Sequence, residues 1–323
     1  MRDPSAGFSL VELTAALALT LGLTAAIFSL TQSSRAASTA QSEAADEQQR
    51  TRVVVDTIAR DLVMAGAGPY LPGHSGPLNG SVPAVLPFRR GMIGSDPAGT
   101  FKSDTITVLY IPTTAAQTTL TADLGAGSVT MQVARVPVCA AGVNLCSFSS
   151  GMTVLAYDRG GAFQIFTVAA VLDGVSQLKT SAPSPALYPA GTPVVEVRVH
   201  SYTLKTDAAT QSTQLIQYDG TDSADVPVLD HVVGLTFDYG IAPSELTDGP
   251  WRPDAASADR WDVDLLRIRT IGVTVRLEAA LAGLRGPAGA LFANGGTATN
   301  PHAWLPDQEI RFHVSPRNLS LRR

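Results

Sequence analysis

The sequence predicts an α+β fold in which one long N-terminal helix packs on an antiparallel β-sheet that carries a β-rich insertion. Three observations support this prediction. Residues 8–30 are apolar or small apart from Glu12, and residues 31–65 contain neither Gly nor Pro and keep a helical apolar period. After Gly66 the chain changes to short runs rich in Val, Thr, Ile and Tyr, separated by turn residues.

Composition bounds the class of protein. The chain has 323 residues, of which 45% are hydrophobic and 16% are charged, with a formal net charge of −5. The charged fraction is below the roughly 25% that is usual in soluble domains. The net charge gives no reason to expect a general attraction to nucleic acid, and a local basic patch on the folded surface is the remaining alternative. Nucleic acid is therefore expected only as an indirect partner.

Residues 8–30 are long enough to span a bilayer as a helix, because about 20 apolar residues suffice. The Thr and Ser hydroxyls in this stretch can bond to carbonyls of the preceding turn. A secretory signal peptide has a shorter apolar core with a small-residue cleavage site after it, whereas here Gly7 precedes the run. Glu12 near the start admits a simple interpretation as an interfacial carboxylate favoured by the helix dipole. That interpretation leaves the positions of Gly7 and Phe8 unexplained.

The stretch "GFSLVELTAALAL" resembles the prepilin cleavage and methylation signature of type IV pilins and type II secretion pseudopilins. The resemblance implies that prepilin peptidase removes a leader of residues 1–7 by cutting between Gly7 and Phe8, and that Phe8 is then N-methylated. Glu12 becomes the fifth residue of the mature chain, where the family pairs it with the terminal amine of the adjacent subunit. Opposite charges attract strongly in a low-dielectric filament core, and either alone is costly to bury. Glu12 is thus expected to direct assembly.

Two departures from the family pattern narrow the prediction. The leader "MRDPSAG" holds one Arg and one Asp, so its positive-inside signal is weak. Residues 8–30 also lack the helix-bending Pro that major pilins commonly carry. The missing Pro favours a minor pilin or a pseudopilin over the main filament subunit, within the pilin-like fold that the resemblance implies.

Residues 31–65 are polar but helical in character, and Val54, Ile58 and Leu62 form an apolar stripe. A helix over residues 8–65 is roughly 87 Å long. The alternative is two helices joined by a flexible linker around residues 31–42. The stretch "IARDLVMAGAGPY" also resembles the end of the first helix in PilW-type minor pilins and J-type pseudopilins, through Arg60, Asp61, Leu62, Ala65 and Gly66.

Residues 66–323 are predicted to form a β-rich head. A loop fills residues 66–100, and the strand candidates are 104–111, 128–136, 152–158, 163–172, 193–204, 212–219, 232–240, 266–278 and 308–316. Because there are more strand candidates than a minimal pilin sheet contains, residues 113–192 are predicted to be a β-rich insertion. The insertion contains Cys139 and Cys146, with six residues between them. If this part lies outside the cytoplasm a local disulfide is expected, and the alternative is two unpaired thiols.

The sequence gives no catalytic constellation, so no enzyme, cofactor or metal site is predicted. The five histidines, among them His74 in a "GHSGP" stretch, have no metal-ligand spacing. Asp219, Asp222, Asp225 and Asp230 cluster, but without the spacing of an EF-hand, so calcium is the minor alternative to an ordinary hairpin turn. The three Trp residues (Trp251, Trp261 and Trp304) could form a binding surface, but the simpler interpretation is that they are partly buried core residues.

The function that the resemblance implies is that of a minor pilin of a type IV pilus, priming filament assembly or sitting at its tip. Downstream roles are adhesion, motility or DNA uptake. A pseudopilin of a type II secretion system is the close alternative, and a membrane-anchored adhesin is the alternative of another class. Expected partners are other minor and major pilins, prepilin peptidase, the inner-membrane assembly platform and membrane lipid. The expected location is the inner membrane, single-pass, with the N-terminus cytoplasmic and the head outside, and then the pilus or pseudopilus.

Overall fold

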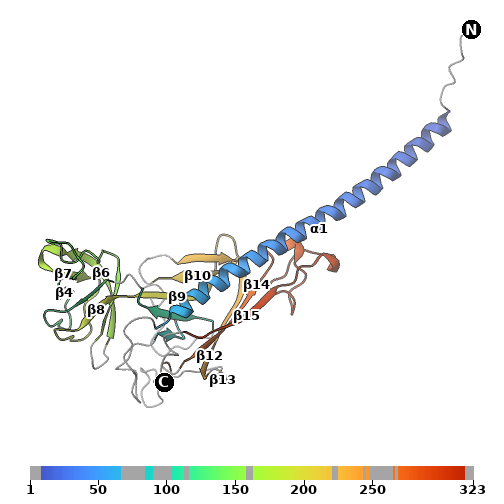
Figure 1. Cartoon of the computed structure of the whole chain (residues 1–323). Helices are drawn as coiled ribbons and strands as arrows, with labels where there is room; N and C mark the ends of the chain where they lie inside the picture. Colours follow the sequence, from blue (N-terminus) through green and yellow to red (C-terminus); the bar gives the residue numbers. More distant parts are fainter. Residues whose placement is uncertain are drawn as a thin grey trace, which may run out of the picture. The chain divides into compact units, whose positions relative to one another are not determined.

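The computed structural model describes residues 9–66, 84–89, 104–112, 116–157, 163–219, 225–242, 245–247, 265 and 268–316 (Figure 1). The chain divides into two compact units, which are treated separately below. One comprises residues 1–49 with 278–307, and the other comprises residues 50–277 with 308–323.

A single helix, α1, runs from Leu10 to Met64 without interruption, as Figure 1 shows. It continues through residues 31–42, so the alternative of two linked helices is wrong. The helix ends where Gly66 adopts a left-handed φ of 74°, a conformation that favours glycine at this position after a helix. The Gly66 N–H donates to the Leu109 carbonyl at 3.0 Å, which ties the end of the helix to a strand.

In the first unit, the chain from Glu278 to Asp307 forms a compact loop with two short 3-10 turns, η4 (Ala282–Leu284) and η5 (Pro301–Ala303). Arg285 and Asn294 both donate to the buried Glu278 carboxylate. The loop reaches α1 where the Ala280 N–H donates to Glu43 Oε1 at 2.5 Å. The unit is therefore held by buried carboxylates that satisfy loop donors.

The second unit contains two antiparallel sheets that enclose the end of α1. One has the order β1 (Val85–Leu86), β2 (Ile106–Tyr110), β9 (Arg198–Thr206), β10 (Thr213–Tyr218) and β11 (Val226–Asp230). The other has the order β13 (Glu245–Thr247), β12 (Val232–Ala242), β14 (Thr270–Leu277) and β15 (Gln308–Val314). Val54, Ile58 and Leu62 of α1 are buried in one apolar core with residues of both sheets, so the predicted stripe is the packed face.

A third antiparallel sheet follows the order β3 (Gln117–Thr119), β8 (Pro193–Glu196), β5 (Thr153–Tyr157), β6 (Phe163–Leu172), β7 (Gln177–Thr180) and β4 (Thr130–Gln132). Its two outer strands meet, because Leu120 and Val133 form an antiparallel bridge. Two backbone bonds flank the bridge, from Thr121 N to Gln132 O at 2.9 Å and from Ala134 N to Thr119 O at 2.8 Å. The sheet thus closes into a six-stranded barrel, which leaves β3 and β4 without open edges.

The barrel has its own core, and its strands alternate between two apolar environments. Val154, Ala156, Phe166 and Val168 are buried in the barrel cluster. Leu155 is instead buried in the core shared with α1, and Ile165 packs against that core. Successive side chains along β5 and β6 therefore point to opposite faces. One set packs in the barrel core and the other packs in the core shared with α1.

The predicted α+β class is confirmed: a long helix packs on antiparallel sheets, and a further β-rich sheet is present. Strands stand in each of the predicted runs. Two expectations were wrong in detail. The run 193–204 is two strands, because the chain leaves the barrel after Glu196 and enters the main sheet at Arg198. Strands β1, β3, β7, β11 and β13 were not predicted.

Candidate functional site

The first half of α1 exposes an apolar surface that nothing in the described chain covers. Every residue from Ser9 to Gln32 is exposed, and Leu10 is 79% and Phe28 is 69% exposed. The best 18-residue window has a mean hydropathy of 2.0, and none of it is buried. By length and composition α1 can cross a membrane.

The threonines in this half are compatible with lipid because their hydroxyls are satisfied within the helix. Thr14 donates to the Val11 carbonyl, and the hydroxyls of Thr20, Thr24 and Thr31 each donate to the carbonyl four residues earlier, at 2.7 Å. An unsatisfied polar group is costly in hydrocarbon, and these bonds remove that cost.

Glu12 stands in the first turn of α1 and closes a capping box with Ser9. The Ser9 N–H donates to Glu12 Oε2 at 3.2 Å, and the Glu12 N–H donates to Ser9 Oγ at 3.2 Å. The Ser-x-x-Glu spacing before an apolar run is the sequence signal for this motif, and the sequence interpretation missed it. Gly7 and Phe8, the predicted cleavage and methylation residues, lie outside the described residues, so the predicted role of all three stays a prediction.

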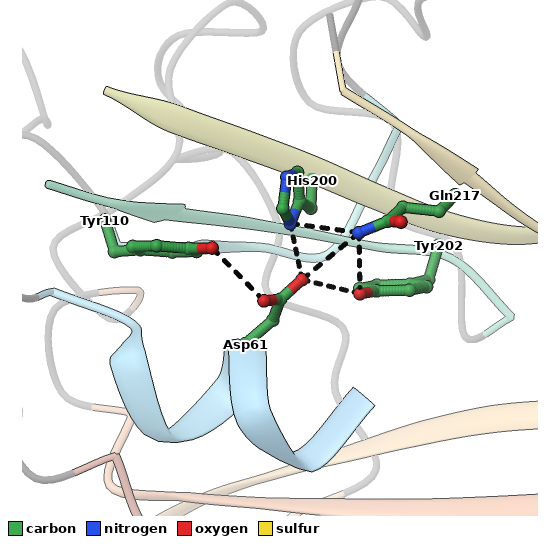
Figure 2. Close-up of polar contacts among 5 residues, drawn as sticks. All are labelled: Asp61, Tyr110, His200, Tyr202 and Gln217. Carbon is green, nitrogen blue, oxygen red and sulfur yellow. Dashed lines mark hydrogen bonds and ion pairs between the residues drawn. The ribbon is translucent and has the colours of Figure 1, made fainter. Parts of the chain in front are cut away.

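A second polar site lies where α1 ends inside the head (Figure 2). Asp61 projects from α1 toward the five-stranded sheet, where Tyr110 comes from β2, His200 and Tyr202 from β9 and Gln217 from β10. His200 and Tyr202 are two residues apart on one strand and so share a face. Gln217 is the register partner of Tyr202 on the neighbouring strand. We call these five residues the Asp61 cluster.

The Asp61 carboxylate accepts hydrogen bonds from all four sheet residues. His200 Nδ1 and the Tyr202 hydroxyl each lie 2.5 Å from Oδ2, the Tyr110 hydroxyl lies 3.3 Å from Oδ1, and Gln217 Nε2 lies 3.4 Å from Oδ2. Gln217 also donates to the Tyr202 hydroxyl at 3.1 Å. Asp61 is only 5% exposed and Tyr202 is fully buried. A buried carboxylate needs such a set of donors to stay charged.

The electrostatics of the Asp61 cluster follow from burial and from these bonds. Burial alone would raise the pKa of Asp61, but the hydrogen bond and charge of His200, with the hydroxyls of Tyr202 and Tyr110, hold it below the ordinary 3.8. Burial and the nearby Asp61 charge raise the pKa of Tyr110 to about 12, and they raise the pKa of Tyr202 further. The carboxylate therefore stays ionised and fully engaged, which suits an anchor for the helix end.

Among the other residues singled out in the sequence, Cys139, Cys146 and Trp304 are described, and they make local contacts of their own. Cys139 and Cys146 form a disulfide, with their Cα atoms 5.6 Å apart. The disulfide closes a short loop, and the Arg135 guanidinium donates to the Cys139 and Ala140 carbonyls in this loop. Trp304 is half-buried and contacts the Phe292 ring edge-on, with centroids 5.6 Å apart. Trp251, Trp261, His74 and Asp222 lie outside the described residues.

The aspartate cluster does not form a calcium site in the described residues. Asp225 is paired with Arg89 at 2.5 Å and Lys205 at 2.9 Å, and Asp230 accepts from Gln214. Burial would raise the pKa of Asp225, but its bonds to Lys205 and the charge of Arg89 lower it below the usual value. Across the described part of the chain, no group of three His, Cys, Asp or Glu side chains could hold a metal ion.

Comparisons with known proteins show a distant similarity. No protein-family model and no curated protein sequence matches the chain. Among solved structures, the chain is similar to a type IV-like pilin from Thermus thermophilus, with 13% sequence identity and a TM-score of 0.21. The match covers 53% of this chain and 87% of that protein. So low a score carries no structural argument by itself.

Proposed function

We propose that this chain is a pilin-like subunit of a filament that assembles from the inner membrane, most similar to a minor pilin of a type IV pilus. The observation that supports it is the division of α1. One half is apolar, exposed and headed by a single carboxylate, and the other half buries one apolar face, with Val54, Ile58 and Leu62, in a folded head. An exposed apolar helix needs a bilayer or neighbouring subunits, and a subunit that moves from membrane to filament uses both in turn.

In this proposal the N-terminal motif supplies the chemistry of assembly. Prepilin peptidase cuts after Gly7 and Phe8 is methylated, which leaves a cationic amine close to the start of α1. The Glu12 carboxylate then leaves the Ser9 N–H, a weak local partner, for the amine of an adjacent subunit. A full charge is a stronger donor than a neutral amide, particularly where apolar helices exclude water.

The test is a pair of carboxylate substitutions on the same helix. Glu12→Gln is expected to leave processing and membrane insertion intact but to remove the protein from sheared filaments. Asp56→Asn, which removes an exposed carboxylate elsewhere on α1, is the matched control and is expected to assemble normally. Mass spectrometry of the mature protein is expected to show methylated Phe8. Retention of residues 1–7 in cells with active peptidase, or normal incorporation of Glu12→Gln, would refute the proposal.

Two other functions remain as outcomes of the same experiment. A type II secretion pseudopilin would also depend on Glu12, but it would copurify with secretion components and its loss would block protein export. A membrane-anchored binding module would keep its activity in Glu12→Gln, because α1 would then serve only as a tether. Packing against the helix requires only an open sheet, yet the chain also forms a closed barrel. That extra barrel is the observation that favours a binding role in addition to assembly.

A further inference from the structure

A polar cavity lies in the second unit where the chain passes from the barrel to the main sheet. Its volume is about 320 Å³, and it is partly open. The walls come from the loop before β5 with the start of that strand (149–153), from the junction of β8 and β9 (196–198), and from Asp219 after β10. Ligand sites commonly form at such junctions, and this volume is at the lower end of their range.

Two buried polar side chains in the wall have unused hydrogen-bonding capacity. Glu196 is only 7% exposed, and its one partner among the described residues is Arg198, whose Nη2 lies 3.1 Å from Oε1. Its other oxygen, Oε2, is not one of the fully buried atoms that lack a partner among the described residues, so it stays open to a molecule in the cavity. Thr153 is also 7% exposed, and its Oγ1 has no hydrogen-bond partner in the described structure. Buried polar groups are normally paired, so the Thr153 hydroxyl is an exception, and the Glu196 carboxylate can accept from a group that enters the cavity.

The rest of the wall offers donors and acceptors side by side. Arg198 is about half-exposed and has guanidinium N–H groups beyond the one that faces Glu196. The Ser150 hydroxyl donates to the Ala169 carbonyl at 2.8 Å and keeps its acceptor lone pairs. Asp219 adds a second carboxylate to the wall. The cavity therefore presents the Glu196 carboxylate as an anionic acceptor, a cationic donor and hydroxyl groups within one small volume.

This combination selects the chemical class of the ligand. Two carboxylates repel a phosphate or sulfate, and Arg198 beside Glu196 disfavours a metal cation or an ammonium group. A neutral polyol avoids both penalties, because each of its hydroxyls donates one hydrogen bond and accepts others. We propose that this cavity binds one neutral sugar unit, with Glu196 as the principal acceptor and Arg198 as the principal donor. The proposal is independent of whether the chain assembles into a filament.

The test uses the full chain in a detergent without a sugar headgroup. Binding of glucose, galactose, mannose and N-acetylglucosamine is followed by saturation-transfer NMR and by calorimetric titration, and calcium chloride is titrated separately. At least one sugar is expected to bind. Glu196→Gln is expected to weaken that binding about tenfold or more, because a hydrogen bond to a charged acceptor is lost. Glu309→Gln changes an exposed carboxylate on β15 and is expected to stay within about twofold.

A second variant guards against misfolding of Glu196→Gln, since Glu196 is buried. Arg198→Ala removes the more exposed partner, and it is expected to weaken the same sugar at least about fivefold while circular dichroism stays unchanged. The proposal is overturned if none of the four sugars binds, or if a sugar binds equally to the native chain and to both variants. It is also overturned if calcium binds and Glu196→Gln abolishes that binding.

Discussion

Replacing Asp61 by alanine tests whether the Asp61 cluster anchors the helix to the head. The substitution removes the acceptor of four donors, two of which lie 2.5 Å from Oδ2. A buried donor left without its acceptor costs about 1–3 kcal/mol, and His200 and Tyr202 each lose such an acceptor. Gln217 still donates to the Tyr202 hydroxyl, so that group keeps one bond. We therefore expect a loss of about 4 kcal/mol in the free energy of unfolding.

Urea unfolding of the full chain in detergent, followed by circular dichroism, measures this loss. Asp56→Ala is the matched control, because Asp56 lies on the same helix but is exposed. It is expected to change the free energy of unfolding by less than about 0.5 kcal/mol. A double-mutant cycle with His200→Ala is expected to show a coupling of about 1–3 kcal/mol between the two side chains. Equal losses for Asp61→Ala and Asp56→Ala would refute the anchoring role.

Acid dependence gives a second test of the Asp61 cluster, with the substitution Asp61→Asn. The pKa of Asp61 is lower in the folded state than its ordinary 3.8. The unfolded chain therefore takes up the proton first as the pH falls, and the stabilisation is present above pH 3.8 and is lost as the pH drops through the folded value. The difference in free energy of unfolding between the native chain and Asp61→Asn is expected to shrink below about pH 4.

Two further substitutions test local features of the two units. Replacing Cys139 and Cys146 together by serine opens a loop whose ends are 7 residues apart in sequence. The double variant is expected to lose about 2.5 kcal/mol in the free energy of unfolding, measured by urea titration. An unchanged urea midpoint would contradict this expectation. Gly296→Ala places a Cβ 2.2 Å from the Arg285 carbonyl oxygen, whereas Gly289→Ala meets nothing within 4 Å. The amide hydrogens of residues 278–307 are expected to exchange faster in Gly296→Ala alone, by an amount equivalent to a loss of about 1–3 kcal/mol in local stability. Equal exchange rates in the two variants would contradict this, because they would show that the loop accommodates the added methyl group.

The parts of the fold that follow a local period could be predicted from the sequence. The helix was predicted because residues 31–65 lack helix breakers and because Val54, Ile58 and Leu62 repeat every four residues. Strands β5, β6, β10 and β12 were predicted from β-branched and aromatic residues between turn signals. β11 was missed because Val226–Asp230 contains Pro and is mostly exposed, which is typical of an edge strand and carries no apolar period.

The polar sites could not be predicted in the same way, because they depend on contacts between distant parts of the chain. Asp61 meets Tyr110 across 49 positions and Gln217 across 156. No local pattern marks these residues as partners, and β9 with its neighbours must form before they meet. Closure of the barrel has the same character, since it rests on one bridge between Leu120 and Val133. The capping box of Ser9 and Glu12 is different, because its signal was local and was overlooked.

Glu12 and Asp61, near opposite ends of α1, differ in how their carboxylates are satisfied. Asp61 is buried in the head and is satisfied by four donors of its own chain, so it needs nothing from outside. Glu12 has one neutral N–H at 3.2 Å, which is sufficient at a wet membrane interface. The ten large apolar side chains described as exposed from Leu10 to Leu30 stand to gain on the order of 20 kcal/mol from burial, at about 1.5–3 kcal/mol each.

Burial of that surface among neighbouring subunits would take Glu12 out of water with them. One amide donor does not compensate a desolvated carboxylate, whereas a cation in direct contact does. Under the proposed function, the amine freed at Phe8 is the cation that becomes available at the same end of the helix. The apolar surface is out of water in the bilayer and in the filament alike, so the pairing of Glu12 with the amine is what favours the filament and selects its register. Loss of the carboxylate should therefore leave the chain in the membrane and out of the filament.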